Sequence, residues 1–587
     1  MVRISLQRVI LFVGFIILAA MFFLVLTLSA LSVPMTVSSP LPEGPYMVKD
    51  ILPGEADSYP SPIIANEDMV YFFAYDAQGR NLWRSDGTDD GSYQLKDLNP
   101  TTGAVPNPYP QYYYPTPQYS NTYPELVDNS LYFSNDDGTH GTELWVSDGS
   151  ISGTLMVKDI YSGTSSSHPI NMTNVNGQLF FRAGGVYSDH DLWVSDGTIT
   201  HTQIVTDLHW VTYYDLVELN GKAYFSADDG VHGAELWTSD GTDSGTYMVK
   251  DIEPESSSSY PFFLQTTDAH VFFFANNFYL EHELWVSDGT AAGTVRVQDT
   301  ITETTFSVDS TFIFATTTDT NLFFTTTGNE LWTSDGTISG THFVKNVKPT
   351  YPNRYSWQAI GDRLFFSASA NEYGRELWVS DGTEIGTYMV KDINPGAGDS
   401  YCSPFEPMAN LNGTLFFAAD DGEHGCELWM SDGTEAGTVM VQDISPGEGS
   451  SNPYCVSATE KTVFFVADDG SHGSELWSLG NMAPMAKDDT AVTRMNHPTS
   501  IPVTNNDFDV NLDAFTIVAV DDPAFGAATI DGGSIIYTPD NGFIGNDTFT
   551  YTVQESEGGL TAVAQVNVIV TGTRTYLPII LHHAGDR

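Results

Sequence analysis

The feature that most constrains this chain is a unit of about 48 residues that occurs nine times. Each copy centres on a tryptophan, and nine of the eleven tryptophans in the 587 residues take part. Seven of the eight intervals between them measure 44 to 51 residues. A fixed period of this size is typical of propellers and solenoids, which are built from small repeated units. The nine are Trp83, Trp145, Trp193, Trp237, Trp285, Trp332, Trp378, Trp429 and Trp477.

Residues 415–444 show the unit at its fullest. Runs of β-forming residues, such as Leu-Phe-Phe-Ala-Ala and Cys-Glu-Leu-Trp-Met, alternate with the turn segments Asp-Asp-Gly-Glu-His-Gly and Ser-Asp-Gly-Thr-Glu-Ala-Gly-Thr. Asp-Gly and Asn-Gly supply the positive φ that tight hairpins need, and no run is long enough for a helix. With a weaker fourth strand before Asn412, the unit predicts one four-stranded blade of a β-propeller. A Pro/Tyr-rich insertion at 106–124 predicts a long surface loop.

The two ends of the array complement each other. The ninth unit leaves the pattern after Trp477, whereas residues 46–51 match the last strand of a unit but come after no tryptophan strand. Pairing them would close the array and remove both free edges. We therefore predict an all-β chain with a closed β-propeller of about nine four-stranded blades over residues 46–480, closed by strand 46–51. Seven or eight blades with displaced units are the alternative.

The position two residues before each tryptophan, usually acidic, admits two interpretations. In the first eight units, Lys, Gln or Thr stands fifteen residues after it. If the Ser-Asp-Gly-Thr turn joins antiparallel strands, the two positions face each other and form favourable cross-strand pairs, with Lys49 as the partner of Glu475. A ring of metal or cation ligands is the other interpretation, and the constant spacing favours the first. The Glu/Lys pairs are Glu143 and Lys158, Glu235 and Lys250, Glu330 and Lys345, and Glu376 and Lys391.

The recurrent Glu-Leu-Trp-Val-Ser-Asp-Gly-Thr, with Gly-Thr-Tyr-Met-Val-Lys-Asp-Ile after it, resembles the bacterial repeat family named after its ELWxxDGT signature. Two units depart from it, with Asn81 and Asp191 in the place of Glu. The resemblance implies an exported repeat protein and supplies no catalytic residues. The Ser-Asp-Gly-Thr turn is also similar to the Asp-box of sialidase propellers, where the box is a folding element.

Four histidines recur in the segment Asp-Asp-Gly-x-His-Gly, five residues before a tryptophan. A metal-binding loop is one interpretation, but Asp and Gly are also what a hairpin turn requires, and this structural interpretation is favoured. A unique nucleophile or acid/base pair would interrupt the repeat, and none does, so we name no catalytic residue. The histidines are His140, His232, His424 and His472.

The composition changes after residue 483, where tryptophan disappears. About seven short strands over residues 484–572 predict a β-sandwich. The Asn-Asp-Phe-Asp and Tyr-Thr-Pro segments resemble the cadherin-like, immunoglobulin-like modules of bacterial surface proteins. Related modules bind calcium, so the resemblance implies calcium as a candidate cofactor, with Asp507, Asp509 and Asp547 as candidate ligands. Residues 573–587 form a tail that is too short to span a membrane.

An apolar segment opens the chain. Residues 9–26 contain no charged residue and come after Arg3 and Arg8, a pattern that keeps the N-terminus in the cytoplasm and exports the rest of the chain. Residues 1–33 are therefore either a signal peptide, cleaved near residues 29–32, or an uncleaved signal-anchor helix that holds the protein to the membrane. Both interpretations predict an extracellular or cell-surface protein.

The charge limits the possible partners of the protein, and the cysteine count limits the number of disulfides. The chain has 22 Lys and Arg against 75 Asp and Glu, a net charge of −53 that excludes nucleic acid as a partner. Three cysteines allow one disulfide at most, and three buried thiols are the alternative. We expect a non-enzymatic binding, adhesion or display platform for an extracellular protein or glycan. The alternatives are a glycan-active hydrolase or lyase with carboxylates at the propeller channel, and a calcium-stabilised envelope component.

Overall fold

The computed structural model describes residues 43–99, 123–184, 190–206, 208–211, 216–254, 256–276, 282–297, 314–326, 330–349, 357–370, 373–402, 408–556 and 559–572. These residues are all-β, apart from one short 3-10 helix, Val503–Asn505. Within them, no helix is long and apolar enough to span a bilayer. The N-terminal helix predicted in residues 1–33, most of the Pro/Tyr-rich insertion and the tail 573–587 lie outside the described residues.

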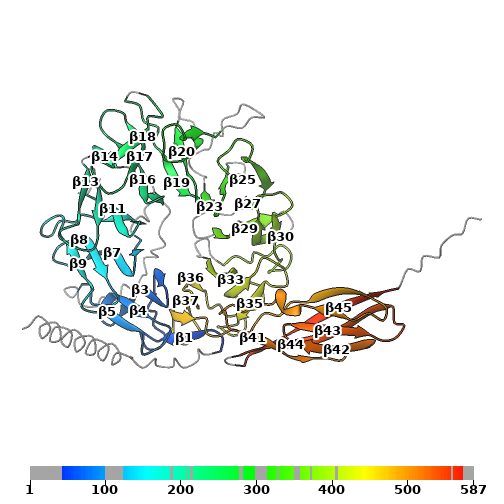
Figure 1. Ribbon diagram of the computed structural model, residues 1–587. Coiled ribbons are helices and arrows are strands. Elements are labelled where there is room, and N and C mark those ends of the chain that lie inside the picture. Colours follow the sequence, from blue (N-terminus) through cyan, green and yellow to red (C-terminus); the bar gives the residue numbers. More distant parts are fainter. Residues whose placement is uncertain are drawn as a thin grey trace, which may run out of the picture. The chain divides into compact units, whose positions relative to one another are not determined.

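Nine antiparallel sheets succeed one another in the described part of the repeat array (Figure 1). Six are meanders of four consecutive strands; in sheets 4 and 7 a fifth, two-residue strand pairs with the same strand as its neighbour, and sheet 9 includes β1. Sheets 1 to 3 are β2 (Ile63–Asn66), β3 (Met69–Asp76), β4 (Gly79–Ser85) and β5 (Tyr93–Lys96); β6 (Glu125–Val127), β7 (Ser130–Asp136), β8 (Thr142–Ser147) and β9 (Leu155–Lys158); and β10 (Ile170–Val175), β11 (Gln178–Gly184), β12 (His190–Ser195) and β13 (Gln203–Thr206). Sheets 4 to 6 are β14 (Trp210–Val211), β15 (Val217–Leu219), β16 (Lys222–Asp228), β17 (Ala234–Ser239) and β18 (Tyr247–Lys250); β19 (Phe262–Thr266), β20 (Val271–Asn276), β21 (His282–Ser287) and β22 (Val295–Arg296); and β23 (Ala315–Thr317), β24 (Leu322–Thr325), β25 (Glu330–Ser334) and β26 (His342–Asn346). Sheets 7 to 9 are β27 (Lys348–Pro349), β28 (Trp357–Ile360), β29 (Arg363–Ala370), β30 (Tyr373–Ser380) and β31 (Tyr388–Met389); β32 (Ala409–Leu411), β33 (Thr414–Asp420), β34 (Cys426–Ser431) and β35 (Val439–Gln442); and β36 (Tyr454–Ala458), β37 (Val463–Ala467), β38 (Glu475–Ser478) and β1 (Tyr46–Lys49).

The register of the tryptophan strand is shared by most sheets. In sheet 2, Trp145 lies opposite Phe133 of the second strand and Met156 of the fourth. A register shift between Leu144 and Trp145 then places Leu144 opposite Lys158. Sheets 1, 3, 4 and 8 show the same shift after the equivalent leucine. One extra residue on one strand of a pair bends the ladder in this way, so residues fifteen apart do not face each other.

The first strand of the array belongs to its last sheet. β1 pairs antiparallel with β38, with Tyr46 opposite Ser478 and Met47 opposite Trp477, which is the strand pairing that the sequence predicts. An apolar cluster lies between every two successive sheets. A further cluster packs Val48 and Phe464 of sheet 9 against Val70 of sheet 1. Sheet 9 therefore packs against sheet 1.

The C-terminal module consists of two sheets around a separate apolar core. The buried Ile535, Tyr537, Val553 and Val566 are central to it, because alternate residues of each strand face inward. Val510, from a loop of this module, joins the apolar cluster between sheets 8 and 9. One sheet holds β39 (Asp489–Arg494), β45 (Thr561–Thr571), β44 (Gly545–Glu555) and β41 (Phe515–Val520), and the other β40 (Thr499–Ile501), β43 (Ser534–Pro539) and β42 (Gly526–Asp531).

Candidate functional site

One hollow in the described part of the repeat array lies where β15, β19, β23 and β28, strands of four successive sheets, end. The turns after β15, β19, β23 and β28 surround a cavity of about 550 Å³. Small-molecule sites in proteins fall in the same size range. The lining residues are Glu218, Leu219, Asn220, Thr266, Thr267, Asp268, Thr317, Thr318, Asp319, Ala359 and Gly361.

The lining of this cavity, which we call the turn pocket, is polar and carries negative charge. Glu218, Asp268 and Asp319 contribute carboxylates, and the described residues of the lining include no lysine, arginine or histidine. The Asp268 amide donates to the Asp319 carbonyl at 3.3 Å, which ties the turns of sheets 5 and 6 together. Sequence analysis missed this pocket, although a signal exists: Thr-Thr-Asp occurs at the same turn in these two units, where Asn-Gly is more usual.

The glutamates before the tryptophans do not form the predicted cross-strand pairs with lysine. Glu143 is fully buried and accepts hydrogen bonds from the Ile160 amide (2.9 Å), the Ser167 amide (3.0 Å) and the Ser167 hydroxyl (2.6 Å). Glu235 and Glu427 bind the equivalent loops in the same way. The predicted pairing is wrong because the register shift moves the lysine opposite leucine. Glu143, Glu235 and Glu427 instead bind the loop that leads to the next sheet.

The predicted partnership of Glu475 with Lys49 is wrong for the same reason. Glu475 accepts hydrogen bonds from the Ile51 and Leu52 amides and, at 2.5 Å, from the Ser58 hydroxyl. Lys49 instead donates to the carbonyl and carboxylate oxygens of Asp89, in the turn of sheet 1.

The lysines of the last strands connect one sheet to the next. The Lys158 ammonium donates to the Thr202 carbonyl of sheet 3 at 2.7 Å and lies 5.5 Å from the centroid of the Trp193 ring. Lys250 makes the same contacts with Thr294 and Trp285 of sheet 5. A charged hydrogen bond and a cation–π contact therefore recur at these inter-sheet boundaries.

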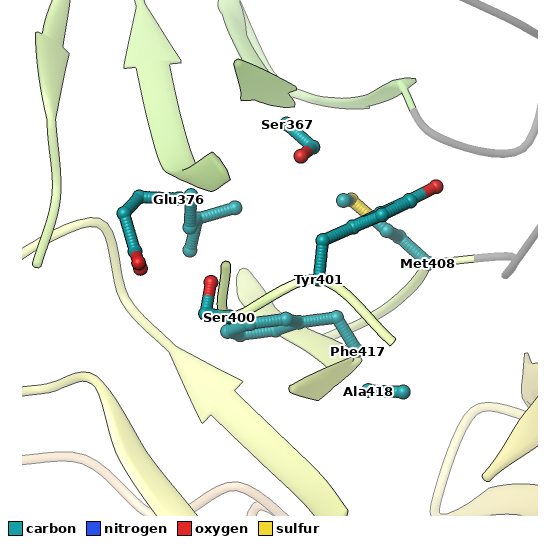
Figure 2. Close-up of a pocket in the computed structure, with 8 residues that line it drawn as sticks. Ser367, Glu376, Ser400, Tyr401, Met408, Phe417 and Ala418 are labelled. Carbon is teal, nitrogen blue, oxygen red and sulfur yellow. The ribbon is translucent and has the colours of Figure 1, made fainter. Parts of the chain in front are cut away.

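Burial changes the acid strength of these glutamates. It raises the pKa of Glu235, Glu376 and Glu475 to about 7, against the opposing effect of the hydrogen bonds that they accept. All three side chains are at most 1% exposed and hold loops. Figure 2 shows the surroundings of Glu376, where Ser367 and Ser400 line a hollow of about 10 Å³. That volume has room for one water at most, so this hollow is not a ligand site.

The Asp-Asp-Gly-x-His-Gly segments form the hairpin turns that the favoured interpretation predicts. In sheet 2, Asp137 accepts hydrogen bonds from the Thr139 and His140 amides, and its other oxygen lies 2.8 Å from His140 Nδ1. This hydrogen bond raises the pKa of His140. The three other segments repeat the geometry, with Asp–His distances of 2.8 Å.

The three candidate calcium ligands bind donors of their own module. Asp507 accepts hydrogen bonds from the Tyr551 hydroxyl at 3.0 Å, and Asp547 from the Tyr537 hydroxyl at 2.8 Å. Asp509 accepts two backbone amides. Within the described ranges, no three His, Cys, Asp or Glu side chains are grouped so as to hold a metal ion.

One disulfide joins Cys402 to Cys426, and Cys455 is a free thiol. Burial raises the pKa of Cys455 to about 11. Of the two interpretations left open by the cysteine count, the structure supports the single bridge.

Comparison with known proteins identifies one part of the chain. A family model described as a bacterial Ig domain matches residues 481–569, which confirms the immunoglobulin-like character of the C-terminal module. No curated protein matches the chain. The fold thus defines an all-β repeat protein with a β-propeller-like array of sheets and a bacterial Ig domain.

Among solved structures, a puromycin hydrolase is 15% identical, with 61% of this chain and 58% of that chain covered and a TM-score of 0.35. A puromycin-hydrolyzing peptidase of Mycobacterium tuberculosis is 10% identical, with coverages of 78% and 65% and a TM-score of 0.36. BamB of Moraxella catarrhalis is 11% identical, with coverages of 56% and 95% and a TM-score of 0.30. This chain spans less than two thirds of the length of either hydrolase, and likeness of this degree has no functional implication.

Proposed function

We propose that the protein is an exported, cell-surface binding platform in which a closed nine-bladed β-propeller presents the turn pocket to an extracellular ligand. The observation that carries the proposal is the cavity of about 550 Å³ in the repeat array. Ring closure is supported by the pairing of β1 with β38 and by the apolar cluster between sheets 9 and 1. Export is supported by the apolar segment in residues 1–33 and by the bacterial Ig domain.

Binding without catalysis is the activity that the chemistry of the pocket favours. A carboxyl group that acts as a general acid needs a raised pKa and has to lie next to the reacting group of the substrate. The glutamates whose pKa is about 7, such as Glu235, are instead buried and accept hydrogen bonds from backbone amides. The carboxylates of the turn pocket then act as hydrogen-bond acceptors and fixed charges.

The test is a binding screen of the purified chain against immobilised glycans and peptides, with the products analysed by mass spectrometry. We expect a ligand to be retained without being shortened, and the substitutions Asp268→Ala and Asp319→Ala together to abolish retention. Asp128→Ala is the matched control, because Asp128 lies in the equivalent turn of sheet 2 and does not line the pocket. Shortened glycans would favour the hydrolase or lyase alternative, and no retained ligand would contradict the platform.

Calcium binding by Asp507, Asp509 and Asp547 remains a prediction of the sequence. Thermal melting of the purified chain with calcium and with a chelator tests it. An unchanged melting midpoint would contradict both a calcium site and a calcium-stabilised envelope role.

A further inference from the structure

One loop of the C-terminal module is buried in the repeat array. The loop, residues 508–513, lies between the short 3-10 helix and β41, and we call it the module loop. Val510 is 1% exposed and belongs to the apolar cluster between sheets 8 and 9, together with Val463 and Leu479 of sheet 9. Phe508 is partly buried against the same cluster. Because burial of apolar surface is favourable, Val510 attaches the module to both sheets.

Hydrogen bonds also join the module loop to the two sheets. The Asn511 side-chain amide donates to the carbonyls of Lys461 and Gly480, each at 3.1 Å. These carbonyls stand two residues before β37 and two residues after β38, so Asn511 joins the open ends of this hairpin of sheet 9. On sheet 8, the Asn412 side-chain amide donates to the Val510 carbonyl at 2.9 Å. Hydrogen bonds are directional, so these contacts fix the position of the loop on the sheets.

The shape of the module loop is fixed within the module itself. Asp509 Oδ1 accepts hydrogen bonds from the amides of Asn511 at 2.8 Å and Asp513 at 3.1 Å. The Leu512 amide donates to the Asp509 carbonyl at 3.2 Å, and the Leu512 side chain is 68% exposed. The turn therefore buries Val510 in the array and leaves Leu512 in solvent. A loop that is ordered by its own hydrogen bonds loses little conformational entropy when it binds.

A charged contact lies beside the module loop. Lys487 Nζ lies 2.5 Å from Asp432 Oδ2, in the Ser-Asp-Gly-Thr turn of sheet 8, and 5.0 Å from the centroid of the Phe508 ring. The equivalent aspartates of sheets 1 to 7 are exposed, whereas the Asp432 side chain is 9% exposed. Salt screens a partly buried ion pair less than an exposed one. Sheet 8 thus differs from the earlier sheets at the turn that the module contacts.

We infer that the C-terminal module is an internal clamp that holds sheets 8 and 9 of the repeat array together. Val510 fills the apolar cluster between the two sheets, Asn511 holds the β37–β38 hairpin, and Lys487 holds a turn of sheet 8. The clamp acts on the sheet that β1 completes. This role goes beyond ligand binding by the platform and does not depend on the turn pocket.

Hydrogen–deuterium exchange of the full chain, followed by mass spectrometry of its peptides, tests the clamp. We expect Val510→Ala to speed amide exchange in β37 and β38 at least about tenfold, because it leaves a cavity between sheets 8 and 9. Leu512→Ala is the matched control, since Leu512 lies in the same loop and is exposed. It should leave exchange in these strands unchanged. Equal exchange in β37 and β38 of Val510→Ala and the wild type would overturn the inference.

Variants of the polar contacts test the clamp without changing the apolar core. Asn511→Ala removes the two hydrogen bonds to sheet 9, and we expect faster exchange in β37 and β38. Lys487→Met removes the ion pair with Asp432, and we expect faster exchange in residues 431–434 of sheet 8. The peptides of β16 and β17 in sheet 4 are the internal reference and should respond less. Faster exchange in the module alone, with sheets 8 and 9 as protected as in the wild type, would contradict the clamp and leave the module a spacer.

Discussion

At the scale of single residues, the repeat assigns glutamate and lysine to different tasks. Glu235 binds the loop that leads from sheet 4 to sheet 5, while Lys250 contacts Thr294 and Trp285 of sheet 5. A constant spacing of fifteen residues results from the repeat itself, and it does not require the two positions to touch. The sequence does not predict that the two positions fail to face each other, because no particular residue type marks the register shift after leucine.

A double-mutant cycle tests the separation of these roles. We expect Lys250→Met to lower the free energy of unfolding by about 1–2 kcal/mol, through loss of a charged hydrogen bond and a cation–π contact. Its coupling with Glu235→Gln should stay below about 0.5 kcal/mol, as for groups that share no contact, whereas coupling with Trp285→Leu should be larger. Chemical denaturation supplies the values. A larger coupling with Glu235 than with Trp285 would restore the cross-strand pair.

The pH dependence of stability arises from the same residues. The pKa of Glu235, Glu376 and Glu475 is about 7 in the folded chain and about 4.5 when unfolded, so between these values the folded state binds more protons. We therefore expect the free energy of unfolding to fall as pH rises from about 5 to about 8. The loop histidines act in the same direction, because hydrogen bonds to aspartate raise their pKa.

Replacing the three glutamates with glutamine removes their contribution to the pH dependence of the free energy of unfolding. The measurement is the melting midpoint of the wild type and of the triple variant at pH 5 and pH 8. The variant should lose most of the difference between the two values. Greater wild-type stability at pH 8 than at pH 5 would show that these carboxyl groups are ionised when buried.

At the scale of elements, the sequence predicted the strands and turns well. Asp-Gly turns and the Leu-Phe-Phe run are local signals, and the four-stranded units arise from them. The two-residue strands β14 and β27 were not predicted, because a strand of two residues is too short to show an alternation of apolar and polar residues. The turn pocket also escaped, because it needs four turns to be brought together in space.

The Cys402–Cys426 disulfide joins the loop before sheet 8 to its tryptophan strand, across a separation of 24 residues. Closing a loop of this length restricts the unfolded chain and contributes about 3 kcal/mol. We expect Cys402→Ser together with Cys426→Ser to lower the free energy of unfolding by about that amount, and a reducing agent to have the same effect on the wild type. The double variant is the control, since reductant should not affect it further. If a reducing agent leaves the free energy of unfolding of the wild type unchanged, the disulfide does not stabilise the protein.

At the scale of the whole molecule, closure of the array is the central claim. In the proposed ring no sheet is terminal, because β1 completes sheet 9 and an apolar cluster packs sheet 9 against sheet 1. The sequence predicted this pairing because the missing strand of the ninth unit has the composition of residues 46–51. The side-chain contacts of β1 could not be predicted from the sequence. The Lys49–Asp89 contact, for example, depends on the register of β1.

The most direct test compares two truncated chains by differential scanning calorimetry, one starting at Gly44 and the other at Leu52. Both lack the N-terminal segment, and they differ only in the strand that closes the ring. We expect the shorter chain to be less stable by at least about 2 kcal/mol, the contribution of burying Val48 alone, and its whole repeat array to melt at a lower temperature. Identical melting curves for the two chains would contradict the closed ring.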